Sequence, residues 1–182
     1  MPSLSEDERT KILELARQSL REAIRPHQVP APIPTEGIFG LTRGVFVSLH
    51  VAGKLRGCIG MVEPCEPLGK CIAQCAASAA LRDPRFAPMR EAEVESAEIE
   101  VSILSPPRSI QAEEIEIGKH GLLIAQGLRR GLLLPQVATE HGLDRERFLE
   151  ETCRKAGLPR DSWKKKETEI FGFTCEIVAR PA

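Results

Sequence analysis

Two segments of strict apolar and polar alternation constrain the fold of this chain more than any other feature. In Val45–Val51 every second residue is Val or Leu, and in Ala97–Ile103 every second residue is Ala, Ile or Val. Successive side chains of a strand point to opposite faces, so each segment predicts a strand with one buried face. Such strands are typical of antiparallel sheets that are covered on one side.

The segment Leu55–Gly60 predicts the second strand of a hairpin, and its register depends on the loop. A two-residue loop, Ala52-Gly53, would place Cys58 on the apolar face of the first strand. A three-residue loop that starts at Val51 would place Cys58 on the polar face, beside Ser48. We favour the three-residue loop because it collects the apolar residues on one face, namely Leu55, Gly57 and Ile59.

Helical spacing and capping signals predict the helices. Ser5 begins a capping box, and apolar residues at helical spacing predict a helix over residues 6–24. Pro67 suits the first position of a helix that runs to about Leu81 and is rich in small residues. Further on we predict a short helix that starts at Pro135 and another that is capped by Asp144 and ended by Gly157. Short strands are predicted at 115–117, 121–125, 131–134 and 170–178.

This order of elements favours an α+β fold, with a mainly antiparallel sheet flanked by helices. It leaves open a smaller lobe that would form a cleft. The prolines of residues 26–40 predict an irregular Pro-rich arm, because proline interrupts both helices and central strands. Since the preceding amphipathic helix needs a surface to cover, we expect the arm to wrap the body. We therefore predict a single domain over residues 1–182.

Charge and hydropathy argue against nucleic-acid and membrane partners. The 25 Lys and Arg residues nearly balance the 26 Asp and Glu residues, which gives a formal net charge of −1. A chain with mixed charges of this kind has no long-range field to attract a polyanion or an anionic membrane. The sequence also has no run of about 18 apolar residues and no signal-peptide pattern. We expect a cytoplasmic protein.

The six cysteines predict reduced thiols rather than a metal or disulfide framework. The spacing of Cys58, Cys65, Cys71 and Cys75 contains no Cys-x-x-Cys pair and does not match the usual zinc or iron–sulfur ligand runs. The chain also lacks the usual phosphate-binding loop, His-Glu-x-x-His and Gly-x-Ser-x-Gly. The sequence therefore predicts no metal and no cofactor.

Cys58 is the candidate catalytic nucleophile. The flanking glycines Gly57 and Gly60 would let a substrate approach closely, and the guanidinium of Arg56 would favour the thiolate. The alternative is a small buried thiol, since free cysteine is among the most buried residue types. Both interpretations stay open at this point.

His120 and Glu100 are the other candidate catalytic residues. His120 lies in a turn between two glycines, where we expect an exposed imidazole that acts as a general base or proton shuttle. Glu100 lies on the polar side of its strand, where it would orient a histidine or pair with an arginine. The alternatives are a solvated loop histidine and a solvated strand face.

Arg56, Asp83 and Arg85 are candidate substrate-binding residues, because guanidinium groups bind anionic groups with paired hydrogen bonds. Asp83 and Arg85 flank Pro84 in a rigid turn. The alternative is that Asp83 caps this turn and Arg85 forms a structural ion pair with it.

Six segments together resemble the AMMECR1 domain family, in order and in spacing, from about Leu13 to Ile177. They are Leu55–Gly60, Asp83–Phe86, Ile99–Ser105, Gly118–Leu122, Leu132–Ala138 and Lys155–Leu158. The resemblance implies an intracellular α+β domain whose biochemical activity is unsettled. It also implies a shared pathway with a Memo-like protein and a radical S-adenosylmethionine (SAM) protein, which are encoded beside similar prokaryotic proteins. Cys65, Cys71 and Cys75 lie outside these segments.

Two functions fit these residues. The first is a thiol-dependent enzyme that acts on a small polar or anionic metabolite with Cys58 as nucleophile. The second is a noncatalytic adaptor that docks through Leu55–Gly60 onto a Memo-like or radical SAM component. Catalysis requires a concave site and a reactive thiolate, whereas docking requires an apolar patch with an arginine anchor. The sequence leaves the choice between them, and the oligomeric state, open.

Overall fold

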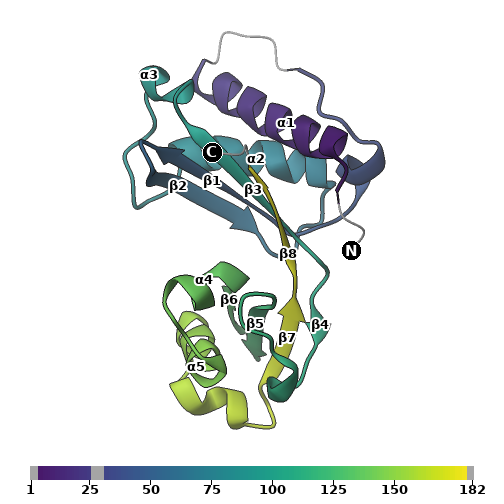
Figure 1. Ribbon diagram of the computed structural model, residues 1–182, viewed down its shortest axis with the longest axis vertical. Coiled ribbons are helices and arrows are strands. Elements are labelled where there is room, and N and C mark those ends of the chain that lie inside the picture. The colour runs from purple at the N-terminus through teal and green to yellow at the C-terminus, as the bar shows by residue number, and fades with distance from the viewer. Residues whose placement is uncertain (1–3, 26–30, 180–182) are drawn as a thin grey trace. The chain divides into compact units, whose positions relative to one another are not determined.

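The computed structural model describes residues 4–25 and 31–179 and confirms the α+β class. The chain divides into two compact units, each with its own antiparallel sheet and helices (Figure 1). Unit 1 takes the residues up to Leu104 and those from Glu176 onward, and unit 2 takes Ser105–Cys175. The cleft expected beside a smaller lobe stays a prediction.

Unit 1 is a four-stranded sheet with two long helices on one face (Figure 1). The strand order is β2-β1-β3-β8. The strands are β1 (Val45–Val51), β2 (Lys54–Met61), β3 (Glu98–Leu104) and β8 (Cys175–Ala179), and the helices are α1 (Glu6–Ile24), α2 (Leu68–Leu81) and the short α3 (Glu91–Val94). The alternating segments therefore form the strands that they predict.

Local signals set the ends of the two long helices. The Ser5 hydroxyl accepts a hydrogen bond from the Glu8 backbone N–H, and the Glu8 carboxylate accepts one from the Ser5 backbone N–H, so the predicted capping box is confirmed. Pro67 is the residue before α2. Residues 26–30 of the predicted arm lie outside the described residues, and its described part ends in a short 3₁₀ helix, η1 (Gly37–Gly40).

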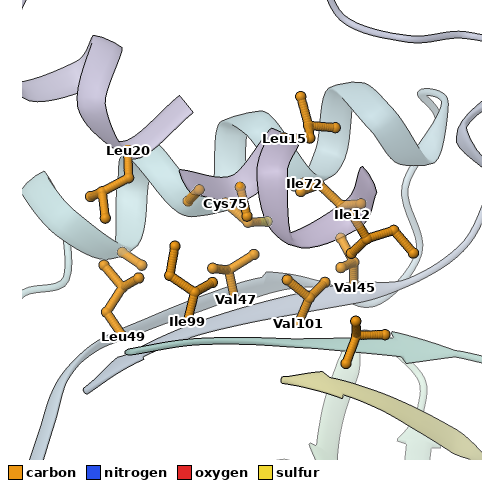
Figure 2. Close-up of a cluster of buried hydrophobic side chains, with 14 of the residues drawn as sticks. Ile12, Leu15, Leu20, Val45, Val47, Leu49, Ile72, Cys75, Ile99 and Val101 are labelled. Atoms are coloured by element: carbon orange, nitrogen blue, oxygen red, sulfur yellow. The ribbon is translucent and has the colours of Figure 1, made fainter. Parts of the chain in front are cut away.

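The core of unit 1 lies between the helices and one face of the sheet (Figure 2). The inward residues of β1, which are Val45, Val47 and Leu49, are fully buried. They pack with Ile12 and Leu20 of α1, and Figure 2 also shows Ile72, Cys75, Ile99 and Val101 in this cluster. The other face of the sheet, which carries the polar residues of the alternation, points away from both helices.

Small residues let α2 approach the sheet very closely. A Cβ atom at Gly57 of β2 would overlap the backbone carbonyl of Ala79 in α2. Only glycine fits at this contact, which explains why Gly57 packs against the alanine-rich end of the helix.

In the β1–β2 hairpin the predicted three-residue loop is wrong, but the predicted face of Cys58 is confirmed. Val51 pairs with Lys54, so the loop has two residues, Ala52 and Gly53, both with positive φ (50° and 72°). The register then shifts by one residue between His50 and Leu49 at a β-bulge. As a result Cys58 pairs with Ser48 on the polar face.

Leu55 lies before the bulge, and our prediction for it is wrong. It pairs with His50 rather than joining the apolar face, and it is exposed.

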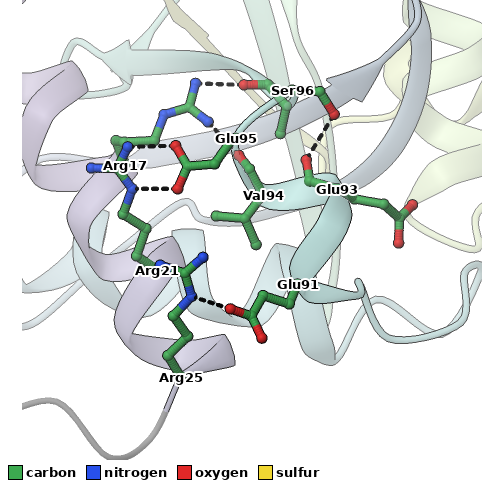
Figure 3. A network of polar contacts seen from close by, with 9 residues as sticks. Arg17, Arg21, Arg25, Glu91, Glu93, Val94, Glu95 and Ser96 are labelled. Atoms are coloured by element: carbon green, nitrogen blue, oxygen red, sulfur yellow. Dashed lines mark hydrogen bonds and ion pairs between the residues drawn. The ribbon is translucent and has the colours of Figure 1, made fainter.

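Three arginines spaced four residues apart, two on α1 and one directly after it, hold the segment that leads into β3 (Figure 3). Arg17 donates to the carbonyls of Val94 and Ala97. The two that follow it form ion pairs with carboxylates of the same segment, Arg21 with Glu95 and Arg25 with Glu91. This network fixes the residues around α3 against α1.

Unit 2 has a second four-stranded sheet in the order β4-β7-β5-β6. Its strands are β4 (Arg108–Ser109), β5 (Gly121–Gln126), β6 (Arg129–Leu133) and β7 (Glu169–Phe173), and its helices are α4 (Pro135–Glu140), α5 (Arg145–Lys155) and the 3₁₀ turns η2 (Ala112–Glu114) and η3 (Arg160–Lys164). Its separate core includes Leu122, Ile124, Phe148 and Leu149, which are fully buried. Asp144 caps α5 as predicted, by accepting from the backbone N–H of Arg147.

Two strand predictions in this part of the chain are wrong. Residues 115–117 are not a strand, because a 3₁₀ turn precedes Ile115 and a turn follows it. The strand predicted over 170–178 is interrupted at Thr174, which separates β7 from β8. All of β8 except its first residue, Cys175, belongs to unit 1. At this point Ser105 donates its backbone N–H to the Thr174 carbonyl, and Thr174 donates its own to Ser105 Oγ, each at 2.9 Å.

Among the described helices, none combines the length and the apolar character that crossing a membrane requires.

Candidate functional site

Cys58, Ser48 and Glu100 form a row across three strands on the face of the unit 1 sheet that points away from the helices. Ser48 of β1 pairs with Cys58 of β2 on one side and with Glu100 of β3 on the other. The Ser48 hydroxyl donates to Cys58 Sγ at 3.2 Å. All three side chains are half-buried. A thiol with a hydroxyl donor on one side and a carboxylate beyond it is a suitable arrangement for proton transfer.

Asp83 is the group that holds the Cys58 backbone in place. Its side chain is only 2% exposed, and Oδ2 accepts a hydrogen bond from the Cys58 backbone N–H at 2.9 Å. Oδ1 accepts from the backbone N–H of Arg85, which closes the Asp83–Arg85 turn. Asp83 therefore caps the turn and at the same time fastens it to β2.

The guanidinium of Arg85 completes this arrangement. It donates to both Asp83 oxygens, from Nε at 3.0 Å and from a terminal nitrogen at 2.7 Å, and it lies 3.4 Å from the Cys58 carbonyl oxygen. These hydrogen bonds hold the pKa of Asp83 well below its usual range, although burial acts in the opposite direction. The pKa of Arg85 is raised, first by Asp83 and to a lesser degree by the Cys58 thiol.

Arg85 nevertheless stays accessible. Its side chain is 55% exposed, and the guanidinium lies over the ring of Phe86 at 5.3 Å from the centroid. A fixed, exposed guanidinium beside a cysteine is well placed to bind an anionic group.

Arg56, by contrast, uses all three of its nitrogens within the protein. It donates to both carboxylate oxygens of Glu93 and to the carbonyls of Ala87 and Pro88. These hydrogen bonds lower the pKa of Glu93 to about 2. Arg56 therefore positions the loop that carries Asp83 and Arg85, and the predicted substrate contact of Arg56 stays a prediction.

His120 belongs to unit 2, and the exposure that we expected for it is wrong. Its side chain is buried, and Nδ1 accepts a hydrogen bond from the backbone N–H of Glu116 at 3.1 Å. A neutral imidazole held in this way carries its proton on Nε2, which is buried and has no partner among the described residues. Nε2 is then a donor rather than a base. Because Cys58 belongs to unit 1, the predicted pairing of the two side chains stays a prediction.

Four of the other five thiols differ from Cys58 in their burial, whereas Cys175 is half-buried like Cys58. Cys71, Cys75 and Cys153 are buried, and burial raises the pKa of each, to about 12 for Cys75. Cys65 is exposed. Within residues 4–25 and 31–179 no three His, Cys, Asp or Glu side chains lie together as metal ligands would.

The structure thus brings together four of the six predicted site residues around Cys58 and assigns Arg56 to a supporting position nearby. Sequence reasoning missed Glu93, which no motif marks. It did place Ser48 on the same face as Cys58, and the register was the signal from which their contact could have been found.

The fold defines the chain as a two-unit α+β protein, in which each unit has an antiparallel sheet and helices. The sheet of unit 1 bears Cys58, whose backbone is held by the Asp83–Arg85 turn. The sequence model of the AMMECR1 family matches residues 13–178, which include both units. The chain belongs to the AMMECR1 family.

Relatives with similar sequences cover nearly the whole chain. A protein of Methanothermobacter thermautotrophicus is 42% identical, with 96% of this chain and 95% of the relative covered. A protein of Aquifex aeolicus is 38% identical, with 92% and 90% covered. The crystal structure of an uncharacterized protein from Pyrococcus horikoshii matches with a TM-score of 0.83 and 38% identity, over 92% of this chain and 88% of that one. None of these names states an activity.

Proposed function

We propose that this protein is a thiol-dependent acyl-transfer enzyme in which Cys58 is the nucleophile. The observation that carries the proposal is the hydrogen bond from Ser48 Oγ to Cys58 Sγ, made on a half-buried sheet face next to an exposed guanidinium. The hydroxyl and the guanidinium would stabilise the negative charge that sulfur carries when a cysteine acts as a nucleophile.

The row of residues supplies a route for the proton. Cross-strand neighbours have Cβ atoms about 4.5–5.5 Å apart, so Glu100 is within reach of Ser48. A hydroxyl both accepts and donates, and Ser48 can therefore pass the thiol proton to Glu100. The thiolate then attacks the carbonyl carbon of an ester and the C–S bond forms. The bond to the leaving oxygen breaks, and that oxygen takes the proton from Glu100 and departs as an alcohol. Water later hydrolyses the thioester, which releases the carboxylic acid and restores the thiol.

Arg85 gives the proposal its substrate class. Asp83 holds its guanidinium beside Cys58, while more than half of the side chain remains exposed. A small metabolite with a carboxylate or phosphate would bind there and bring its acyl carbon to sulfur. His120 has no place in this scheme as a base, because its Nδ1 is occupied and Nε2 carries the proton.

The first test uses p-nitrophenyl acetate and a Cys65→Ser background, which removes the exposed thiol. We expect one acetyl group on Cys58 by mass spectrometry and a matching release of p-nitrophenolate. Ser48→Ala and Glu100→Gln should slow acetylation by about 100-fold or more, the range typical for loss of proton transfer. Equal acetylation of Cys58→Ala protein, or labelling confined to another cysteine, would contradict the proposal.

The second test measures charge selectivity at Cys58. Iodoacetate is anionic and iodoacetamide is neutral, so the ratio of their alkylation rates reports a nearby cation. We expect Cys58 to favour iodoacetate over iodoacetamide roughly fivefold more than Cys65 does, which corresponds to about 1 kcal/mol. Arg85→Gln should bring the ratio at Cys58 to that of Cys65, the internal control. An unchanged ratio would remove Arg85 from the site.

An adaptor function is the second candidate, and the stacking of Arg85 on Phe86 favours it. Exposed arginine and aromatic side chains are enriched among the residues that dominate binding energy at interfaces. In this proposal the Leu55–Gly60 face and the Asp83–Phe86 turn dock onto a Memo-like or radical SAM protein. Docking requires Arg85 but not a reactive thiol.

Calorimetry with such a partner separates the two functions. Adaptor function predicts that Arg85→Ala weakens binding by tenfold or more while Cys58→Ser leaves the affinity within twofold of wild type. An absence of binding by the wild-type protein would reject it, and the acetylation result is independent of this measurement.

A further inference from the structure

Unit 2 contains a pocket that belongs to neither proposal. Its volume is about 590 Å³, and it lies where β6, α4 and α5 meet. This volume falls in the range of small-molecule sites, which are typically apolar with a few polar groups at the edge. Every residue that lines it belongs to unit 2.

The wall of the pocket is aliphatic. Leu133 of β6, Val137 of α4 and Leu143, which precedes α5, line it and pack against the core of unit 2. All three are only partly buried, so the core of this unit continues outward to an accessible apolar surface. A hydrocarbon group that covered this surface would gain about 25 cal/mol for each Å² of apolar area buried.

The rim is cationic. Arg154 and Lys155 lie at the end of α5, and His141 follows α4. The one carboxylate of the lining, Glu151, is already engaged by Arg154 at 2.5 Å and by Arg160 at 3.3 Å. Glu151 therefore does not offset Lys155, which forms no ion pair with any described residue.

We propose that this pocket binds a small amphipathic carboxylate, whose aliphatic chain packs on Leu133, Val137 and Leu143 while its carboxylate pairs with Lys155. The complementarity of charge and shape selects this ligand class. A neutral chain would leave Lys155 unpaired, and a short hydrophilic anion would leave the apolar wall exposed to water.

The probe for this site is octanoate, measured by isothermal titration calorimetry with the full chain. We expect saturable binding with a negative heat-capacity change, the signature of apolar burial. Acetate, which lacks the chain, and octyltrimethylammonium, which reverses the charge, should each bind at least tenfold more weakly. Absence of octanoate binding at several millimolar, or equal binding of octyltrimethylammonium, would overturn the proposal.

Matched variants locate the binding. Lys155→Glu should weaken octanoate binding by about tenfold or more, whereas Lys166→Glu, an exposed lysine of the same unit that is outside the pocket lining, should change it less than twofold. Val137→Asn should weaken binding through the aliphatic wall, and thermal unfolding of each variant verifies that it is folded. Full affinity in both Lys155→Glu and Val137→Asn would refute the site. Cys58→Ala should bind octanoate normally, which separates this result from the proposed enzyme.

Discussion

The buried carboxylate of Asp83 accepts a hydrogen bond from the backbone N–H of Cys58, although the two residues lie on a turn and on a strand. The same carboxylate binds the guanidinium of Arg85. One side chain therefore fixes the position of the candidate nucleophile and that of the exposed guanidinium beside it, and this relationship yields the first prediction.

Replacement of Asp83 by Asn should destabilise unit 1 by about 1–3 kcal/mol, because hydrogen bonds to a charged, buried acceptor are lost. The value stays below that of a fully buried ion pair because Arg85 is half exposed. Urea unfolding measures it. Asp144→Asn, which keeps a helix cap, is the control and should cost less than about 0.5 kcal/mol. A change at Asp83 no larger than this would contradict its proposed positioning role.

The Arg56–Glu93 pair should make stability depend on acid pH. The pKa of Glu93 is lowered from an ordinary value of 4.5 to about 2 by Arg56, so its contribution is complete above about pH 4.5 and is lost as the pH falls toward 2. Glu93→Gln should therefore be less stable than wild type at pH 7, and the difference should shrink between pH 4.5 and 2. Urea unfolding at several pH values measures the difference, and a pH-independent difference would exclude this linkage.

Alkylation should divide five of the six thiols, all except the half-buried Cys175, into two groups. Cys65 and Cys58 should react with iodoacetamide in the native protein, since Cys65 is exposed and Cys58 is half-buried. Cys71, Cys75 and Cys153 should react only after unfolding, because burial both blocks access and raises their pKa. Peptide mass mapping before and after addition of urea checks this order. Native labelling of Cys153 as fast as that of Cys58 would be the contrary result.

Gly57→Ala should be strongly destabilising, by about 2 kcal/mol or more, because the added methyl group would overlap the Ala79 carbonyl and force α2 away from the sheet. Gly53→Asn in the hairpin loop is the matched control. Gly53 has a positive φ of 72° that asparagine tolerates, and no atom lies near its added side chain. Thermal unfolding compares the two variants, and equal stability would mean that the close contact is not required.

Four helices, α1, α2, α4 and α5, and the face of Cys58 could be predicted from the sequence, because capping residues and periodicity act locally. The short α3 was not predicted. The loop at Ala52 could not be predicted, since the β-bulge that follows it leaves no sequence signal. The extra residue of the bulge offsets the shorter loop, so Cys58 lies on the same polar face that a three-residue loop would have given. Leu55, which precedes the bulge, was therefore misplaced while Cys58 was not.

The break at Thr174 shows a second limit of sequence patterns. The apolar alternation of the sequence continues through this residue to Ile177, but in β8 Val178 is buried and Ile177 is exposed. The pattern therefore does not reveal that the chain changes from one sheet to the other. In the site, the Asp83–Arg85 pair was foreseen as one of two alternatives. The burial of His120 was not, because it depends on a hydrogen bond to Glu116 that flanking glycines do not predict.

The paired hydrogen bonds between Ser105 and Thr174 have a consequence for how this gene can change. The chain enters unit 2 after β3 and leaves it before β8 at two neighbouring points. Unit 2 is therefore one continuous segment inserted between these two strands. An insertion whose ends already meet can be lengthened, exchanged or given a new ligand pocket without altering the strand order of the host sheet. Unit 2 and the sheet face of unit 1 that bears Cys58 can therefore evolve separately within one polypeptide.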